Sequence, residues 1–348
     1  MDVSTEPINM EYIREASEIL KQGGLVAFPT ETVYGLGGDA TDKEASRKIY
    51  AAKGRPSDNP LIVHISKFSQ LEAISKDLPE NAKKLADAFW PGPLTMVVNK
   101  NQVIPYETTG GLDTVAVRMP NNPVALALIE ESGCMIAAPS ANTSGRPSPT
   151  KASHVAQDLS GKIDAILDGG AVDIGLESTI VDLTEDVVTV LRPGYINMDM
   201  LREVVGQVRM DPGIVFNDKG TTSGAKPKAP GMRYKHYAPK GDLTIISGEE
   251  ETVISTINKM TEEAEASGSK VGIIATSETA DRYSGGQVLV IGDRADEGSI
   301  AHNLYDILRQ FDELEVDVIY SESFATPNMG QAIMNRLLKA AGQKTIEV

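Results

Sequence analysis

The first 210 residues alternate short apolar runs with amphipathic segments. Residues 9–22 place Ile13, Ala16 and Leu20 on one helical face, and Gly23-Gly24 ends the pattern, so a helix is predicted here. Apolar runs bounded by turn residues predict buried strands. These runs lie at 25–28, 61–64, 94–98, 114–118, 135–138, 165–168, 178–183 and 187–192, with further helices expected at 41–52, 81–89, 122–131 and 198–205. Many strands with few crossover helices predict a mixed sheet with helices packed on it.

The pattern becomes more regular after about residue 242, where strands and helices alternate. Strands are expected at 243–247, 270–275, 287–291 and 316–320, and helices at 249–266, 297–311 and 328–341. Such alternation predicts a small, parallel, doubly wound domain. Gly, Pro, Ser, Thr and Lys are frequent between the two patterns, as in a linker. We therefore predict an α/β protein with a first domain at 1–210, a linker or lid at 211–241 and a second domain at 242–348.

Composition narrows the class of protein. The chain has 348 residues and a formal net charge of −16, so a broad phosphate-binding surface for nucleic acid is not expected. A single cysteine, Cys134, excludes an internal disulfide and a multi-cysteine zinc site. The sequence has no long uncharged apolar run and no signal-peptide pattern at its start. We expect a protein of the cytoplasm with no membrane partner.

Two stretches without Asp or Glu stand out against this acidic background. Residues 132–157 carry Arg146, Lys151 and His154, and residues 219–241 carry six Lys or Arg. Positive islands in an acidic chain indicate focused attraction of a small polyanion such as a nucleotide. Solvated basic loops are the alternative.

The segment AKGRPSDNPLIVH, residues 52–64, places Lys53 and Arg55 one residue apart. Pro56 and Pro60 favour extended or turn backbone, in which residues at i and i+2 share a face. The two cations are therefore expected to point at one anion, with His64 at the far end of a short buried strand. A basic surface loop leading into a core strand is the other interpretation.

Further candidates lie at predicted strand ends. Arg118 closes a strand and suits a bidentate hold on a carboxylate or phosphate. Residues 139–146, PSANTSGR, offer hydroxyls and small residues that let backbone N–H groups approach a phosphate. Ser178 and Arg192 add a hydroxyl and another cation. For each of them, an ordinary surface role is the alternative.

Residues 29–40, PTETVYGLGGDA, are expected to form a loop in which Thr30 and Thr32 line a pocket or simply make turn contacts. The GLGGDA part matches a dinucleotide fingerprint formally, but its first glycine is seven residues past the strand and no acid follows at the right distance. A serine hydrolase built on Ser140 and His64 would lack the G-x-S-x-G turn. Residues 230–239, PGMRYKHYAP, have the aromatics and cations of a lid over a bound nucleotide.

Taken together, these motifs resemble the YrdC-type threonylcarbamoyl-AMP synthases, in the long two-domain form with a Rossmann-like C-terminal domain. The resemblance spans nearly the whole chain and rests on FPTETVYGLG (28–37), KGRP (53–56), NPL (59–61), WPGPLT (90–95), VRMP (117–120), PSAN (139–142), LRPG (191–194), PGMRYKHYAP (230–239) and AIMNR (332–336). It implies a twisted mixed sheet around a basic cavity, followed by the Rossmann-like domain. It also implies a nucleotidyltransferase that joins L-threonine, bicarbonate or CO2, and ATP into threonylcarbamoyl-AMP and pyrophosphate.

The resemblance also implies roles for individual residues. Threonine would be held by Thr32, His64, Arg118, Ala138 (through its backbone) and Ser178. ATP would be held by Arg55, Asn59, Thr114, Ser140, Asn142, Ser148, Arg192 and Tyr234. Lys53 and Arg55 would be the catalytic cations, and Mg2+ would accompany ATP. The product would pass to a separate complex that transfers the threonylcarbamoyl group to tRNA, with no tight tRNA binding by this chain.

One alternative of a different class stays open at this point. A non-catalytic nucleotide- or RNA-binding module would also use a basic cavity. Salt-dependent RNA affinity would identify such a module.

Overall fold

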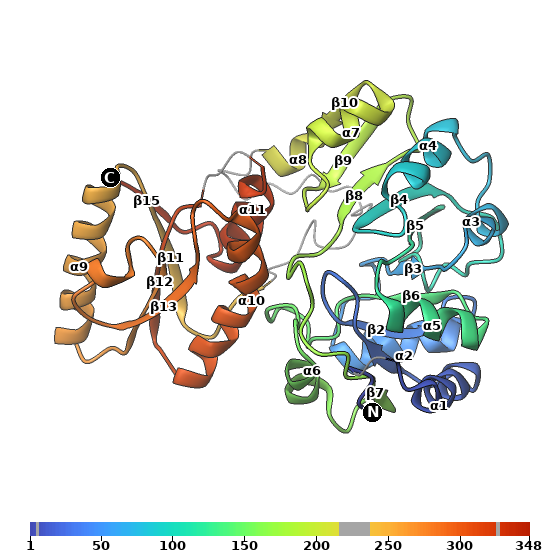
Figure 1. Cartoon of the computed structure of the whole chain (residues 1–348), viewed down its shortest axis with the longest axis horizontal. Helices are drawn as coiled ribbons and strands as arrows, with labels where there is room; N and C mark the ends of the chain where they lie inside the picture. The colour runs from blue at the N-terminus through green and yellow to red at the C-terminus, as the bar shows by residue number, and fades with distance from the viewer. Residues whose placement is uncertain (5–6, 216–236, 325–327) are drawn as a thin grey trace. The chain divides into compact units, whose positions relative to one another are not determined.

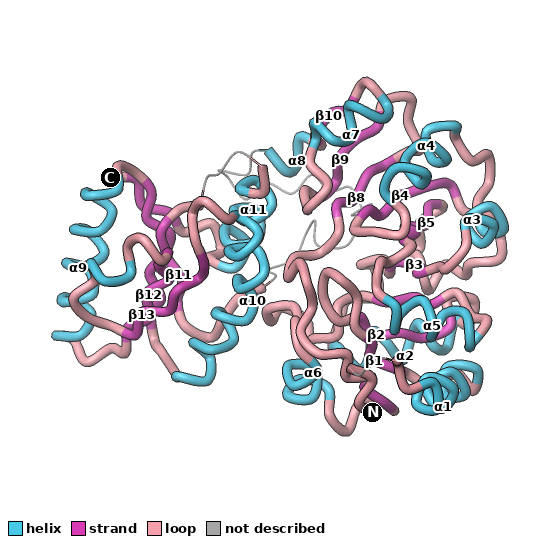
Figure 2. Tube along the Cα trace, viewed as in Figure 1, coloured by secondary structure: helices cyan, strands magenta, loops and turns pink. Residues whose placement is uncertain are grey.

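The computed structural model describes residues 1–4, 7–215, 237–324 and 328–348. The chain divides into two compact units, and Figures 1 and 2 show the helices and strands of each. The first unit comprises 1–144, 148–173 and 177–234, and the second comprises 145–147, 174–176 and 235–348. Most of the predicted linker, 211–241, lies outside the described residues. The domain limits at 210 and 242 therefore stay a prediction.

The first unit is a mixed α/β structure, as predicted. Its described helices are α1 (Met10–Lys21), α2 (Lys43–Lys53), α3 (Phe68–Ile74), α4 (Glu80–Phe89), α5 (Pro123–Ser132), α6 (Ala152–Leu159), α7 (Met198–Val205) and α8 (Pro212–Val215). Its described strands are β1 (Val26–Phe28), β2 (Gly35–Asp39), β3 (Ile62–His64), β4 (Leu94–Asn99), β5 (Thr114–Arg118), β6 (Ile136–Ala138), β7 (Ala165–Ile166), β8 (Thr179–Asp182), β9 (Val188–Arg192) and β10 (Val208–Met210).

The strands of the first unit form one sheet, ten-stranded within the described residues, in the order β10-β9-β8-β4-β5-β3-β6-β2-β1-β7. Parallel pairs (β8 with β4, β5 with β3) alternate with antiparallel ones (β9 with β8, β4 with β5, β3 with β6). Strands far apart in sequence thus lie side by side at the centre of the sheet.

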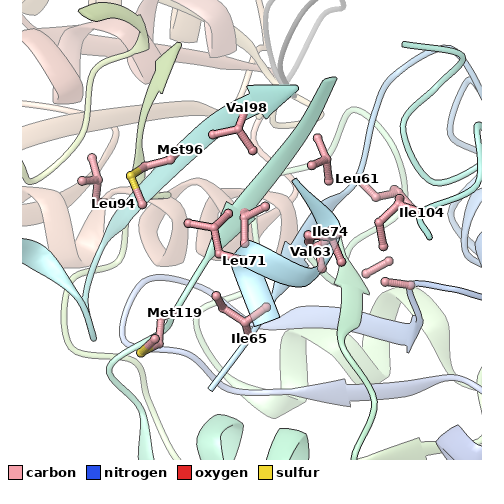
Figure 3. Packing of buried hydrophobic residues seen from close by; sticks show 14 of the residues in the cluster. Leu61, Val63, Ile65, Leu71, Ile74, Leu94, Met96, Val98, Ile104 and Met119 are labelled. Atoms are coloured by element: carbon pink, nitrogen blue, oxygen red, sulfur yellow. The ribbon is translucent and has the colours of Figure 1, made fainter. Parts of the chain in front are cut away.

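Alternate side chains of the strands enter different apolar clusters, because successive residues of a strand point to opposite faces. In β6, Ala137 belongs to the large core cluster, whereas Ile136 and Ala138 join a second cluster with α1 and α5. Figure 3 shows side chains of the large cluster, among them Val63, Leu71 and Met96. The core therefore occupies both faces of the sheet, and the strand ends are left to carry polar side chains.

The prediction of a loop over residues 29–40 is wrong for its second half, which is strand β2. A Cβ atom added at Gly37 would lie 2.7 Å from Cγ2 of Ile136 and 2.8 Å from Cε1 of Phe28. Only glycine fits so close to neighbouring side chains. The glycines that suggested a loop are instead what allows β2 to pack between β1 and β6.

The expectation of extended backbone through Lys53 and Arg55 is also wrong. Lys53 is the last residue of α2, and Gly54 ends the helix in the left-handed conformation with φ of 62°. Glycine adopts this conformation at little cost, which is why it so often follows a helix. The turn separates the two cations, so they do not share one face of an extended segment.

The second unit is the parallel α/β domain that the sequence predicts. Its described elements are β11 (Asp242–Ser247), α9 (Glu250–Ala266), β12 (Val271–Thr276), the 3-10 helix η1 (Ala280–Arg282), β13 (Gln287–Gly292), α10 (Glu297–Leu314), β14 (Val318–Glu322), α11 (Gly330–Ala340) and β15 (Thr345–Glu347). The strand order is β13-β12-β14-β11-β15 with every pairing parallel. This arrangement confirms the predicted fold class.

Candidate active site

One transverse row across five neighbouring strands of the first unit carries polar side chains on every strand but β8, where Ile180 stands. His64 of β3 lies opposite Arg118 of β5, and Arg118 lies opposite Thr95 of β4. Thr95 is paired in turn with Ile180 of β8, and Ile180 with Arg192 of β9. The structure therefore brings together residues that are widely separated along the chain.

The same alternation explains the neighbours of this row. Ala116 lies two residues before Arg118, and Ile62 lies two residues before His64. Both belong to a small apolar cluster that also contains Val97. Period-two alternation therefore places Arg118 and His64 on the face of that cluster, away from the large core. Thr114, predicted to bind ATP, lies at the start of β5 on this same face, four residues before Arg118.

Arg118 is buried among polar partners and is 4% exposed. Its Nη1 donates to Oγ1 of Thr32 at 2.8 Å, and its Nε donates to the Gly92 carbonyl at 3.4 Å. Its Nη2 lies 2.7 Å from Oε1 of Glu31. The guanidinium is therefore fixed in orientation, as a residue that holds a carboxylate must be.

His64 is 4% exposed and stacks edge-on against Phe28, with ring centroids 5.9 Å apart. Burial, followed by the nearby charge of Arg118, lowers the pKa of His64 from 6.5 to about 3. The Ile62 carbonyl lies 3.2 Å from Nδ1, which donates to it when it carries the proton. The imidazole is thus neutral at physiological pH and adds no charge to the site.

We predict that His64 makes the protein less stable in mild acid. Below pH 6.5 the unfolded chain binds a proton at His64 that the folded chain does not bind, so stability is complete above 6.5 and is lost as the pH falls toward 3. Urea unfolding should show that the wild type loses about 2 kcal/mol more than His64→Gln between pH 7.5 and 5.0. Equal losses in the two proteins would contradict this account.

Ser178 and Arg192 form the other end of the row. Arg192 donates from Nε to the Ser178 carbonyl at 3.0 Å and from Nη2 to the Ser178 Oγ at 3.2 Å. The Ser178 Oγ is also 2.7 Å from Oγ1 of Thr95. A residue predicted for threonine and one predicted for ATP are therefore in direct contact.

Lys53, Ser140 and Asn142 make a second group. The ammonium of Lys53 donates to the backbone carbonyls of Ser140 and Asn142 and lies 3.5 Å from the Asn142 Oδ1. The Ser140 hydroxyl donates to the same Oδ1 at 2.6 Å. The loop after β6 joins β2 through the bridge between Ser140 and Gly35. Ser140 and Asn142, which lie in the stretch without Asp or Glu, thus both contact the buried ammonium of Lys53.

Arg55 and Asn59 make a third group beside α2. Arg55 is 8% exposed and donates from Nε to the Asn59 carbonyl and from Nη2 to the Pro60 carbonyl, both at 3.1 Å. The Oδ1 atom of Asn59 is buried and has no hydrogen-bond partner among the described residues. A buried amide oxygen of this kind is expected to meet a ligand donor.

The remaining predicted residues are placed as follows. Ala138 ends β6 opposite Ile62 and is 2% exposed. Ser148 is fully buried and donates its hydroxyl to Oε1 of Glu177. Tyr234 lies outside the described residues, as does most of the predicted lid.

Comparison with known proteins shows the family of this chain. A family model described as "Telomere recombination" matches residues 18–194, and one described as "Threonylcarbamoyl-AMP synthase, C-terminal domain" matches residues 196–342. A threonylcarbamoyl-AMP synthase of Pyrococcus abyssi is 48% identical over 336 residues, covering 97% of this chain and 96% of that protein. The Bacillus subtilis threonylcarbamoyl-AMP synthase is 48% identical over 348 residues, covering 99% and 98%. This chain belongs to the threonylcarbamoyl-AMP synthase family.

Solved structures support the family assignment and the fold. The crystal structure of P. abyssi Sua5 complexed with L-threonine has a TM-score of 0.93 and 46% identity, and the match covers 100% of this chain and 99% of that one. The E. coli YciO structure matches with a TM-score of 0.50 and 25% identity, over 56% of this chain and 93% of that one. The predicted YrdC-like fold, the two-part architecture and the threonylcarbamoyl-AMP synthase activity are thereby confirmed.

Three residues that were not predicted contact the predicted site residues. Glu31 and Glu177 contact the predicted residues Arg118 and Ser148, and Thr95 links the row to Ser178. The sequence did carry a signal for each of them: Glu31 lies between the two threonines that were considered, Glu177 directly precedes Ser178, and Thr95 ends the WPGPLT motif. Their role as partners of other side chains required the folded structure.

Two absences apply to the described part of the chain. No helix there is long and apolar enough to cross a lipid bilayer. Across residues 1–4, 7–215, 237–324 and 328–348, no group of three or more His, Cys, Asp or Glu side chains is placed to hold a metal ion.

Proposed function

We propose that this chain makes threonylcarbamoyl-AMP from L-threonine, bicarbonate or CO2, and ATP, with release of pyrophosphate. The observation that carries this proposal is the row across β3, β5, β4, β8 and β9. That row contains two buried arginines, Arg118 and Arg192. Arg118 has hydroxyl and imidazole neighbours. Such an arrangement suits an amino acid held beside a triphosphate.

The amino acid is proposed to bind at the Arg118 end. The guanidinium of Arg118 would take the carboxylate, and Thr32, Ser178 and His64 would surround the side chain. Hydroxyl and imidazole partners that are buried lose their hydrogen bonds when a ligand lacks the matching hydroxyl. Threonine would therefore be preferred over analogues without that group.

ATP is proposed to bind from Arg192 toward the loop at 139–148 and the Arg55–Asn59 turn. Arg192 and Arg55 would neutralise phosphate charge, and the small residues around Ser140 would let backbone N–H groups approach a phosphate. Lys53 is proposed to neutralise charge on the phosphates or on the carbamate. Tyr234, outside the described residues, is proposed to cover the nucleotide.

The chemistry asks little covalent work of the protein. Threonine's neutral amine adds to CO2 with loss of a proton, or to bicarbonate with loss of water, and so becomes a carbamate. A carbamate oxygen then attacks the α-phosphorus, and pyrophosphate leaves with the electron pair of the broken P–O bond. Catalysis would then come from holding the two reactants together and from neutralising charge as pyrophosphate departs. This division of work explains why cations and hydroxyls dominate the predicted site.

Mg2+ is proposed to enter with ATP. This ion usually keeps several waters and binds phosphate oxygens, and it requires few protein ligands. The oxygen-rich partners near Ser140 and Asn142 are compatible with such an outer-sphere role. When bound, Mg2+ would neutralise charge on the triphosphate.

The product is proposed to pass to a separate transferase complex that acts on tRNA, without tight tRNA binding by this chain. The net charge of −16 supports that part of the proposal, because tight RNA binding requires clustered cations. The cytoplasmic location expected from the sequence stays a prediction.

The proposal is tested by incubating the protein with ATP, Mg2+, L-threonine and bicarbonate and identifying products by mass spectrometry. We expect threonylcarbamoyl-AMP and pyrophosphate in equal amounts, with both products absent when threonine is omitted. Pyrophosphate release that is independent of threonine, or AMP without the carbamoyl adduct, would contradict it. Serine at the same concentration provides the matched amino-acid control for side-chain recognition.

A further inference from the structure

Glu31 is a buried carboxylate that the proposed function does not use. It follows β1, and its side chain is 6% exposed, beside the 4% exposed side chain of Arg118. Glu31 Oε1 lies 2.7 Å from Arg118 Nη2. Within the described part of the chain, no other carboxylate lies within ion-pair distance of Arg118.

The contact leaves hydrogen-bonding capacity unfilled. Both carboxylate oxygens of Glu31 and Nη2 of Arg118 have no aligned hydrogen-bond partner among the described residues. The other nitrogens of Arg118 do have partners, in Thr32 and the Gly92 carbonyl. Buried charged atoms without such partners are rare in proteins and call for a specific explanation, which a bound ligand would supply.

The charges at this point cancel. Arg118 contributes one positive charge and Glu31 one negative charge, while Thr32 is neutral. Charges are costly to bury unless they are balanced, so a buried, balanced pair accepts a ligand of zero net charge most readily. A free α-amino acid meets this condition because its carboxylate and ammonium cancel. A carboxylic acid without the ammonium, or an amine without the carboxylate, leaves one charge unbalanced.

We propose that Glu31 is a specificity-determining residue, whose negative charge makes the site at Arg118 select a zwitterionic amino acid over anionic or cationic analogues of the same shape. This inference rests on the proposed binding of threonine at Arg118. It makes Glu31, which was not among the residues predicted from the sequence, the negative group that recognises the charge of the ligand. Direct contact with the substrate ammonium is not required, since Coulomb interactions act across several ångströms in a buried site.

The test compares three ligands by calorimetric titration. L-Threonine is the zwitterion, (R)-3-hydroxybutanoate lacks the ammonium and is an anion, and L-threoninol lacks the carboxylate and is a cation. The wild type should bind threonine at least about tenfold more tightly than either analogue. In Glu31→Gln the site gains net positive charge. Its preference for threonine over hydroxybutanoate should shrink by about tenfold or more, while threoninol binding weakens further.

The controls separate recognition from structure. Glu31→Asp keeps the charge and should restore the wild-type order of affinities. If Glu31 acted only through packing, the order of affinities would not depend on whether the residue is charged. If Glu31→Gln weakens all three ligands by the same factor, the proposal is overturned while threonine-dependent turnover of the wild type still supports the proposed function. If the wild type fails to bind threonine at all, the proposed function fails and this inference with it.

A second measurement covers the case in which Glu31→Gln does not fold. The wild type alone must then discriminate against both analogues. Affinity for hydroxybutanoate equal to that for threonine would overturn the proposal without any variant.

Discussion

A Lys53→Met variant should release pyrophosphate from ATP and threonine about a thousandfold more slowly than the wild type, the largest effect expected here. Lys53 is 2% exposed, and its ammonium holds the carbonyls of Ser140 and Asn142. Methionine has similar length and no charge, so it removes the cation with little change in volume. The loss would combine missing charge neutralisation with a misplaced loop.

The two contributions can be separated by further variants and by stability. Leaving two buried carbonyls unpaired should cost about 1–3 kcal/mol each in unfolding free energy. Lys53→Arg keeps the charge and should recover part of the rate if charge is the larger contribution. Lys43→Met, at the exposed start of the same helix, is the matched control and should be near normal. Turnover of Lys53→Met within tenfold of the wild type would refute the predicted role.

An Arg118→Lys variant should bind threonine at least a hundredfold more weakly, with a smaller effect on ATP affinity. Arg118 reaches Thr32, Glu31 and the Gly92 carbonyl at once through a planar group. A lysine ammonium keeps the charge and cannot reproduce this fork, so orientation toward a carboxylate is lost. Titration calorimetry of threonine, with and without a non-hydrolysable ATP analogue, measures the effect.

The matched control for this change is Arg209→Lys. Arg209 of β10 donates to Thr189 and Glu185, and its side chain is 53% exposed. It tests the same substitution on a strand of the same sheet, outside the row. Unchanged threonine affinity is expected there. Equal weakening in both variants would show a general effect on the sheet and would remove the assigned role of Arg118.

Much of the fold could be predicted because apolar periodicity is a local signal. The strands at 94–99 and 114–118 and the helix at 10–21 have clear patterns and, for the helix, an Asn9 cap and a glycine stop. Strand β2 could not be predicted in this way. Its Gly35, Gly37 and Gly38 carry no side chains, so no alternation exists to be read. The strand forms because glycine is small enough to fit against the side chains of Phe28 and Ile136.

Short peripheral elements were also missed. Helices α3 and α6 and strands β10 and β15 were not predicted, because each is short and mixes polar with apolar residues. In strand β10 all three residues are exposed or half-buried, so it has no hydrophobic signal of its own. Its pairing with β9 defines it, and pairing is a property of the folded sheet.

For the site, the sequence predicts candidate residues but not the contacts that they make. Arg118 and Arg192 are predicted as cations at strand ends, and the strand order places both in one row, with Ser178 in contact with Arg192. The geometry at Lys53 and Arg55 was wrong because Gly54 in left-handed conformation turns the chain between them. Glu31 lies between two predicted threonines in the sequence, but its role as the counterion of the distant Arg118 is visible only in the folded structure.

The order of strands at the centre of the first unit has a consequence for biosynthesis. β4 lies between β5 and β8, and β9 follows β8, so Arg192 completes an arrangement begun by His64. A nascent chain that ends before β9 holds most of the predicted binding residues and still lacks Arg192. The ability to hold the amino acid and the nucleotide together should therefore arise only when the late strands dock beside β4, and not grow gradually as the ribosome extends the chain.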